Sequence, residues 1–254
     1  MASTPAVAVA GLSKYFPQLE LRHFLALRRP PGVCALREVS FELMAGENLC
    51  ILGPNGSGKT TLIKLIATLL TPTQGRIWVQ GQDTGAASLS IKRHLGFITC
   101  NEESFYGRLT GWQNLAFFAR LHNLNPKDAV PPVARVLKLE PYLDRRFFSY
   151  STGIKRRFDI ARGLLHQPDI LLLDEPTTNL DPIATQEVRQ LLAQLQGQGK
   201  TMIIVTHRLE EVQKMRGRLA IMKEGRLQEV QPAAGESLED LYRQVVQGDG
   251  HGPA

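Results

Sequence analysis

The sequence predicts an α/β protein with a mainly parallel sheet, an N-terminal antiparallel β layer and an inserted helical segment. Three observations favour this class. A short apolar run at residues 48–52 leads through a glycine-rich loop into a helical pattern. Two further apolar runs end in Asp174-Glu175 and in Thr206-His207. Because ligands bind beyond the carboxyl ends of parallel strands, we expect these polar residues at one edge of the sheet.

Composition bounds the class of protein. The 254 residues, 43% hydrophobic and 21% charged, suffice for one large domain with a lobe or for two small domains. The three cysteines form no C-x-x-C pair, which disfavours disulfides and a zinc site and favours a reducing compartment. The chain shows no signal peptide and no run near ~20 apolar residues, so we expect a protein that does not cross a bilayer by itself.

The net charge of +6 permits an anionic partner, whether a nucleotide, a nucleic acid or lipid headgroups. Part of the excess lies in residues 22–29, a mixed basic and apolar segment that is followed by Pro30-Pro31. This segment suits either a membrane surface or a solvated insertion, and the shortness of the run favours the insertion.

Segments before and after the glycine-rich loop have strand character, which predicts the β layer. They are residues 7–10, 35–43 and 76–79. Helical spacing dominates between residues 110 and 165, with two apolar sets. The sets are Trp112, Leu115, Ala116 and Ala119, and Phe117, Phe118, Leu121 and Leu124. A packed core or a docking surface for another protein explains so broad an apolar surface, and we favour the core.

The glycine-rich loop matches the phosphate-binding pattern G-x-x-x-x-G-K-[ST] in full and predicts a nucleoside triphosphate as ligand. Its residues are Gly53, Pro54, Asn55, Gly56, Ser57, Gly58, Lys59, Thr60 and Thr61. The three glycines can adopt φ values that other residues resist, which turns successive amides toward a phosphate. Lys59 adds a positive charge, and the Thr60 hydroxyl suits Mg²⁺. A plain glycine turn before a helix would not need Lys59 and Thr60 at these positions.

Residues 170–174 form an apolar run that ends in adjacent carboxylates, as expected of a buried parallel strand. After a complete phosphate-binding loop, Asp174 suits Mg²⁺, held through water, as the Walker B acid of P-loop NTPases. Glu175 suits orienting and deprotonating the attacking water, a contribution of ~10²–10⁴-fold in rate. On its own, the Asp-Glu pair would be an ordinary strand end.

A strand, helix and strand pattern closes the chain at residues 201–205, 209–215 and 219–222. His207 follows the first of these strands and is expected at the same sheet edge. There it would donate a hydrogen bond to the γ-phosphate or to its leaving oxyanion. A helix-capping or surface histidine is the alternative.

These residues, with Ser151-Thr152-Gly153 before Asp174 and Asn179-Leu180-Asp181 after Glu175, resemble the nucleotide-binding subunit of ATP-binding cassette (ABC) transporters over nearly the whole chain. The resemblance implies a P-loop NTPase core. Its expected parts are a core with the β layer over about 1–94 and 166–230, a helical subdomain over about 95–165, and a C-terminal extension over 231–254 with a disordered tail from 248.

The resemblance also implies a dimer in which the P-loop of one subunit and the signature helix of the other hold ATP. Ser151, Thr152 and Gly153 stand at the signature position, and a serine hydroxyl with backbone amides at a helix N-terminus is a natural anion site. Asp181 falls in the D-loop that crosses the dimer interface. Tyr15 falls where an aromatic ring stacks on adenine.

Some positions depart from the family pattern. Asn101 stands near the position of the usual glutamine that helps to bind Mg²⁺, one methylene shorter, with Glu102 as an alternative. Thr152 replaces a glycine and Ile154 a glutamine of the signature. The chain also has the insertion at 18–32 and the short ending at 237–242. In these features and departures it resembles ATPases paired with separately encoded, exporter-type membrane subunits of the ABC-2 kind.

The expected function is ATP hydrolysis, with ATP and Mg²⁺ as cofactors, by a dimer that powers a separate membrane permease from the cytoplasmic face. A non-transport ATPase of the same fold that acts on nucleic acid or ribosomes is the alternative, although such relatives usually carry paired cassettes or long coiled coils. No nucleic acid is therefore expected. A P-loop kinase is a third class, but it would not need Ser151, Gly153 or Asp181.

Overall fold

The computed structural model describes residues 4–17, 32–86, 89–99, 105–215, 217–232 and 237–247. Most of the insertion expected at 18–32, the position of Asn101 and Glu102, and the tail from 248 lie outside the described residues.

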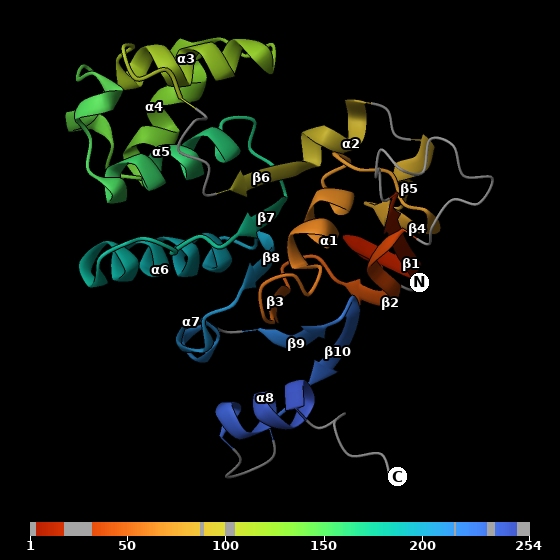
Figure 1. Cartoon of the computed structure of the whole chain (residues 1–254). Coiled ribbons are helices and arrows are strands. Elements are labelled where there is room, and N and C mark those ends of the chain that lie inside the picture. Colours follow the sequence, from red (N-terminus) through yellow and green to blue (C-terminus); the bar gives the residue numbers. More distant parts are fainter. Residues whose placement is uncertain are drawn as a thin grey trace, which may run out of the picture. The chain divides into compact units, whose positions relative to one another are not determined.

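Strands and helices alternate along most of the chain (Figure 1), which confirms the predicted α/β class. In chain order, with η for a 3₁₀ helix, the elements are β1 (Val7–Phe16), β2 (Val33–Leu43), β3 (Asn48–Leu52), α1 (Lys59–Ile66), β4 (Gln74–Val79), β5 (Gln82–Asp83), η2 (Thr84–Ala86), α2 (Leu89–His94), β6 (Leu95–Thr99), α3 (Gly111–Leu121), α4 (Pro126–Val136), η4 (Glu140–Tyr142), η5 (Phe147–Ser149), α5 (Thr152–Leu164), β7 (Ile170–Asp174), α6 (Pro182–Gly197), β8 (Thr201–Thr206), α7 (Leu209–Lys214), β9 (Arg218–Lys223), β10 (Arg226–Val230) and α8 (Leu238–Gln247).

The strands form two sheets, and the chain divides into two compact units. The four-stranded sheet has the order β2-β1-β4-β5, and the six-stranded sheet has the order β10-β9-β3-β8-β7-β6. The first unit comprises residues 1–44, 49–88 and 205–254, and the second comprises residues 45–48 and 89–204. The four-stranded sheet therefore belongs to the first unit, and α3 to α6 belong to the second.

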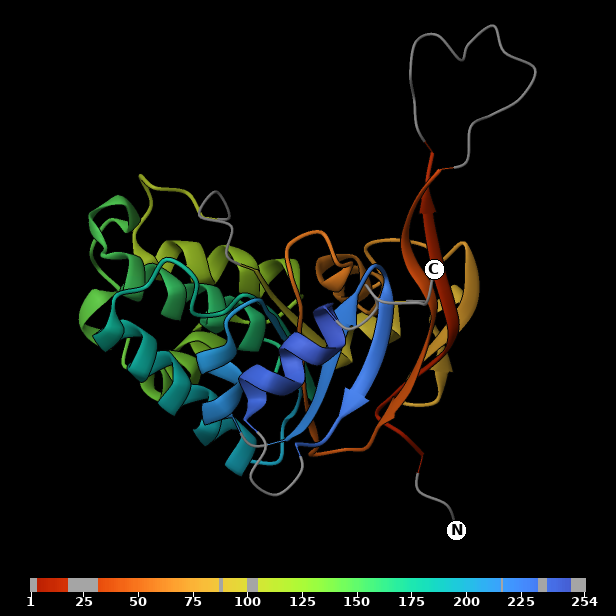
Figure 2. The same cartoon turned by 60° about the horizontal axis from the view of Figure 1, so that its bottom comes forward.

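In the first unit, β1 pairs antiparallel with β2 on one side and with β4 on the other. β2 accompanies β1 to its end, where Phe16 lies opposite Val33, and Figure 2 shows the two long strands side by side. This pairing explains why β1 reaches Phe16 although the local pattern predicted a strand only over residues 7–10. The predicted antiparallel β layer is confirmed.

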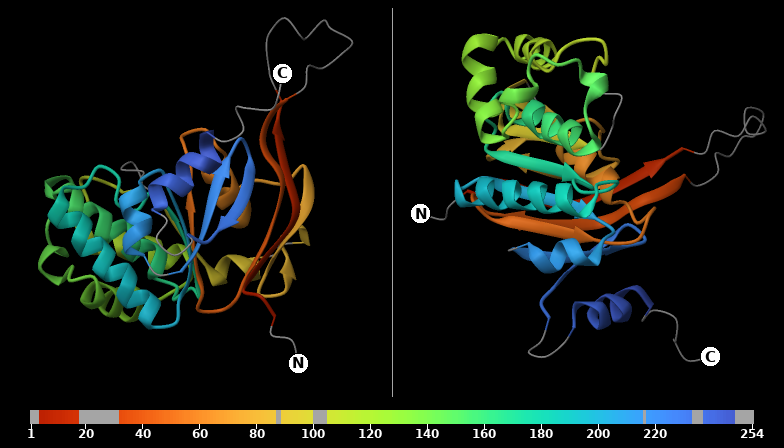
Figure 3. Two further views of the ribbon diagram at one scale, coloured as in Figure 1. Left: turned by 90° about the horizontal axis from the view of Figure 1, so that it is seen from below. Right: turned by 90° about the vertical axis from the view of Figure 1, so that its left-hand side faces the viewer.

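The first unit also contains β3 from Leu49 onward, which is buried throughout and runs parallel to β9. Cys50 lies opposite Leu219, and Leu52 lies opposite Ile221. β9 pairs antiparallel with β10, and α8 packs near β9 (Figure 3, left). The strands predicted over 48–52 and 219–222 are therefore present, and the glycine-rich loop starts at the carboxyl end of β3.

In the second unit, β6 and β7 are parallel, with Thr99 opposite Asp174. Helices α3, α4 and α5 lie together in this unit (Figure 1). Aromatic side chains form much of the core beneath them. The ring of Phe105 stacks on Phe147 at a centroid distance of 4.5 Å, and Tyr150 stacks on Phe158 at 5.0 Å. Such ring pairs hold the helical segment together and bring α5 against it.

The two apolar sets predicted for α3 have different surroundings. Leu115, Ala116 and Ala119 of the first set are buried, as a packed core requires. Leu121 of the second set is 63% exposed. The core interpretation therefore holds for the first set, and Leu121 contributes to an exposed surface.

His122 and His166 form a stacked pair in the second unit, with ring centroids 4.2 Å apart and an interplanar angle of 8°. The Nε2 atom of His166 lies 3.0 Å from the carbonyl oxygen of Leu95. Burial, and then the neighbouring His122, lower the pKa of His166 from 6.5 to about 4. The neutral ring is therefore the form that fits the folded protein.

This lowered pKa predicts that the free energy of unfolding decreases in acid. Because the unfolded state takes up the proton more readily, the contribution of His166 is complete above pH 6.5 and is lost as the pH falls toward about 4. The expected slope is about 1 kcal/mol of unfolding free energy per pH unit in that window. His166→Gln, whose amide can still donate to Leu95, should flatten this slope in urea unfolding at several pH values. An unchanged slope in the variant would contradict this assignment.

Candidate functional site

The glycine-rich loop joins β3 to α1 in the first unit, as the motif predicted. α1 starts at Lys59, directly after Gly58. Among the described residues, no side chain caps the first turn of this helix, and the first turn has no acidic residue. A helix N-terminus of this kind attracts an anion, because its backbone amides and its dipole favour negative charge.

The three glycines of the loop are required for different reasons. Gly56 and Gly58 have φ values of 80° and 107°, as predicted. At Gly53 the requirement is close packing, because a Cβ atom there would lie 2.3 Å from the carbonyl oxygen of Met222 on β9. Gly58 combines both constraints, since its Cβ would lie 2.4 Å from the carbonyl oxygen of Ala35. The expectation that unusual φ values explain all three glycines was therefore wrong for Gly53.

Lys59 lies over the loop that precedes it. Its side chain is 5% exposed, and its Nζ atom donates to the carbonyl oxygens of Gly53 at 2.8 Å and Pro54 at 2.9 Å. The ammonium group is thus fixed at the N-terminal end of α1. A charge in this place strengthens hydrogen bonds to a phosphate.

Backbone contacts hold the loop in the first unit. The amide of Gly225 donates to the carbonyl of Ser57 at 2.9 Å. The amide of Gly53 donates to the carbonyl of Thr206 at 3.3 Å, so the loop begins beside the residue that precedes His207. The side chain of His207 is exposed. This arrangement brings His207 and the glycine-rich loop to the same end of their strands, as predicted.

Tyr15 lies near the end of β1, with Cys34 opposite it on β2. Its side chain is 43% exposed, so one part of the ring is open to a ligand. A hydrogen bond with the Cys34 side chain raises the pKa of the Tyr15 phenol. The exposed ring is compatible with stacking on a nucleobase.

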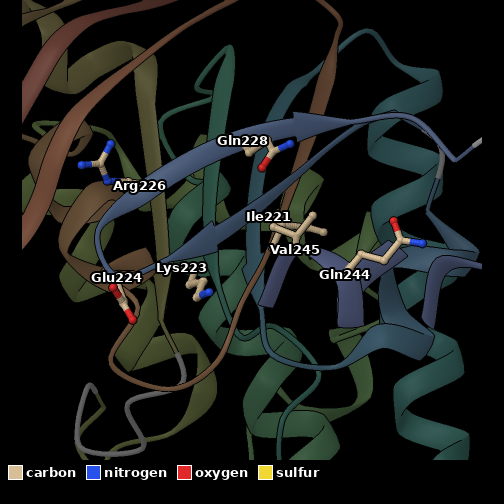
Figure 4. A pocket seen from close by; sticks show the side chains of 7 residues that line it. All are labelled: Ile221, Lys223, Glu224, Arg226, Gln228, Gln244 and Val245. Atoms are coloured by element: carbon tan, nitrogen blue, oxygen red, sulfur yellow. The ribbon is translucent and has the colours of Figure 1, made fainter. Parts of the chain in front are cut away.

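A hollow of about 370 Å³ lies between the β9–β10 hairpin and α8 in the first unit (Figure 4). Lys223, Glu224 and Arg226 line it from the hairpin, and Gln244 and Val245 line it from α8. Its charges are mixed, and none of the predicted phosphate-binding residues lines it. The hollow is therefore not the predicted nucleotide site.

In the second unit, Asp174 ends β7 and Glu175 begins the loop that follows. Both side chains are half-buried. Glu175 has a φ of 53°, which is rare for a residue other than glycine. The Thr178 hydroxyl donates to Oε2 of Glu175 at 3.0 Å, and the Thr178 amide donates to the Glu175 carbonyl at 3.2 Å. Thr178 was not predicted as a site residue, and no local pattern marks it.

Ser151 is the N-cap of α5, the helix expected to carry the signature. Its Oγ atom accepts a hydrogen bond from the amide of Ile154 at 3.4 Å. Ser151 and Thr152 are exposed. Because a hydroxyl has one donor and two acceptor lone pairs, the cap leaves the Ser151 proton able to reach a ligand. The predicted serine-led helix N-terminus is present.

The N-termini of α5 and α6 pack closely. A Cβ atom at Gly153 would lie 2.9 Å from the Cβ of Ala184, so close packing favours glycine there. Asp181 is the N-cap of α6, and its Oδ1 accepts from the amide of Ala184 at 2.9 Å. Next to it, Ile183 is 74% exposed. Asp181 therefore has a structural role in addition to the D-loop position that was predicted.

The hydroxyl of Thr60 in the first unit and the carboxylate of Asp174 in the second unit each carry oxygen atoms of the kind that Mg²⁺ binds. Within the described ranges, no group of three or more His, Cys, Asp or Glu side chains is placed to hold a metal. Mg²⁺ does not need such a group, because it often keeps several waters and takes one or two carboxylates together with substrate phosphates. The other predicted ligand, Asn101, is not among the described residues.

Comparison with known proteins supports the class of protein that the sequence predicted. Residues 36–178 match the family described as ABC transporter. The ABC transporter ATP-binding protein NatA of Bacillus subtilis is 37% identical over 83% of this chain and 86% of its own length. The Nod factor export ATP-binding protein I of Burkholderia thailandensis is 37% identical over 74% of this chain, which spans 62% of that protein.

Solved structures show the same fold. The CbiO1 protein of Clostridium perfringens, described as part of the ABC transporter complex CbiONQ, has a TM-score of 0.78 and 26% identity over 95% of this chain and 94% of its own. A dimeric ATP-binding cassette, MJ0796 with ADP and phosphate, has a TM-score of 0.74 and 24% identity over 89% of this chain and 100% of its own.

The fold and the two motif-bearing units define a P-loop ATPase. The chain belongs to the ABC transporter family, as an ATP-binding subunit that hydrolyses ATP. The predicted resemblance and the predicted P-loop NTPase core are both confirmed.

Within the described part of the chain, no helix has the length and the apolar content that a membrane span requires.

Proposed function

We propose that this ATPase is the motor of an exporter-type transporter. In this proposal, two copies enclose ATP between the glycine-rich loop of one and the α5 N-terminus of the other, and they act on a separate membrane permease at its cytoplasmic face. The exposed, serine-capped N-terminus of α5 is the observation that carries the proposal. A hydroxyl proton and helix amides at an exposed site suit the γ-phosphate of a nucleotide held by a second copy.

The surface around this terminus supports the dimer. Close packing of Gly153 on Ala184 brings the N-termini of α5 and α6 together. Asp181 and Ile183 are exposed on the same helix end, and Ile183 is a large apolar side chain. Protein interfaces commonly bury exposed apolar side chains of this kind next to polar groups.

Different residues carry out different parts of ATP hydrolysis in this proposal. Water attacks the γ-phosphorus, the bond from that phosphorus to the bridging oxygen breaks, and ADP leaves. Glu175 accepts the proton of the attacking water, and Lys59 and His207 stabilise the charge on the phosphate oxygens. Mg²⁺, held by Thr60 and Asp174, would neutralise charge on the β- and γ-phosphates.

The relatives support export and a separate permease. One relative is named a Nod factor export ATP-binding protein. The similar CbiO1 structure is described as one part of a larger transporter complex. An analogous arrangement here would place the transport path in a partner protein, which would then determine the transported substrate.

Complementation between variants tests the shared site. Lys59→Ala removes the phosphate-binding charge, and Ser151→Arg blocks the α5 N-terminus. We expect each variant alone to have little ATPase activity, because both sites of each homodimer are damaged. An equimolar mixture should recover turnover, because a mixed dimer contains one site with an intact loop and an intact serine. Steady-state phosphate release measures the recovery.

The controls separate folding from assembly. Each variant should keep its thermal unfolding midpoint within a few degrees of wild type, and Ser151→Arg should still bind ATP. If both conditions hold and the mixture stays inactive, the shared-site dimer is wrong. Purification from solubilised membranes should recover a permease with the protein, and recovery of ribosomes or nucleic acid instead would favour the non-transport alternative.

A further inference from the structure

The loop between β7 and α6 is held from two sides in the second unit. On one side, Thr178 binds Glu175 through its hydroxyl at 3.0 Å and through its amide at 3.2 Å. Glu175 and Asn179 both have positive φ values, 53° and 63°. Residues other than glycine keep this conformation only where the surroundings enforce it. The contacts made by Thr178 are therefore part of what fixes Glu175.

On the other side, Arg156 reaches the same loop from α5. Its side chain is 5% exposed, and its Nη2 atom donates to the carbonyl oxygen of Thr178 at 3.2 Å. Its Nη1 atom lies 3.7 Å from Oδ2 of Asp159, which is also buried. A buried guanidinium next to a buried carboxylate has few alternative positions, so it holds the Thr178 backbone firmly.

We propose that Thr178 is a positioning residue for ATP hydrolysis, which fixes the Glu175 carboxylate while Arg156 fixes Thr178. The inference rests on the proposed function, because it takes Glu175 as the base. The terminal torsion of a glutamate is broad and roughly two-fold, so a free carboxylate samples many orientations. A hydrogen bond from Thr178 to Oε2 restricts this rotation. The carboxylate is then aligned before water arrives.

Two variants of Thr178 separate the hydroxyl from the shape of the side chain. Thr178→Val keeps the branched shape and removes the donor. We expect kcat to fall ~10-fold, with the KM for ATP unchanged, because misalignment of a catalytic group lowers the rate of the chemical step. Thr178→Ser keeps the donor, and its kcat should stay within ~2-fold of wild type.

A double-mutant cycle with Glu175→Gln tests whether Thr178 acts through Glu175. If it does, Thr178→Val should cause no further loss in the Glu175→Gln background. A wild-type kcat in Thr178→Val, an equal loss in Thr178→Ser, or an undiminished effect in the Glu175→Gln background would overturn the inference. Full turnover in Glu175→Gln alone would instead overturn the proposed role of Glu175, so the two failures are distinguishable.

Discussion

Replacing Glu175 with glutamine is expected to remove most ATP turnover and to leave ATP binding intact. The glutamine side chain has the same length, and its amide oxygen can still accept the hydrogen bond that Thr178 donates to Glu175. The loop should therefore keep its shape. What the variant loses is the base, which contributes ~10²–10⁴-fold in rate.

A trapped dimer is the second part of this expected result. If hydrolysis separates the two copies, a variant that binds ATP without cleaving it should accumulate as a dimer. Size-exclusion chromatography with light scattering, with and without ATP, measures this accumulation. Phosphate release under the same conditions measures the loss of turnover.

Glu187→Gln is a matched control in the same unit. Glu187 is partly exposed on α6 and pairs with Arg157. The Arg157 side chain is largely covered, but it keeps a partner in the variant, because the amide oxygen of glutamine can still accept a hydrogen bond from it. The control should therefore keep wild-type turnover and remain monomeric after ATP is consumed. Wild-type turnover in Glu175→Gln would show that another group removes the proton.

Local patterns predicted the central strands of the fold. β3 and β7 are short, apolar and bounded by polar loops, and each was predicted to within a residue. β10 was not predicted, because most of its residues are exposed and its sequence lacks an apolar alternation. The length of β1 depends on pairing with β2, and pairing between distant segments leaves no local pattern.

The start of helix α6 carries a local sequence signal. Asp181 followed by Pro182 is a strong helix start, since aspartate caps the first turn and proline favours the first helical position. Asp181 was predicted only in its family role in the D-loop. The structure shows that the same carboxylate also caps the helix, so substitutions of Asp181 affect folding and assembly together.

The candidate site could be predicted in residue type but not in its supporting contacts. The motif identified Lys59, Ser151 and Glu175. It contained nothing about Thr178 binding Glu175, a contact that depends on the unusual backbone conformation of the loop at Glu175. It also contained nothing about Arg156 binding Thr178, because that contact depends on how α5 packs on the loop. The requirement for glycine at Gly53 likewise depends on a contact between distant segments, since a Cβ atom there would meet the backbone of Met222.

Gly58→Ala is expected to disrupt the phosphate-binding loop. The φ of 107° at this position is unfavourable for alanine, and a left-handed conformation costs about 1–2 kcal/mol in a residue with a Cβ atom. The new Cβ would also lie 2.4 Å from the carbonyl oxygen of Ala35, a backbone atom that cannot move without disturbing β2. Overpacking of this kind costs a further ~1–3 kcal/mol.

Gly56→Ala separates these two effects. Gly56 also has a positive φ, 80°, but a Cβ atom there would meet no described atom within 4 Å. This variant should lose only the conformational term, about 1–2 kcal/mol of unfolding free energy, and Gly58→Ala should lose clearly more. Urea unfolding measures both losses, and titration with a fluorescent ATP analogue measures binding. Equal destabilisation of the two variants would show that the approach of Ala35 to Gly58 does not constrain the loop, because only the backbone conformation would then matter.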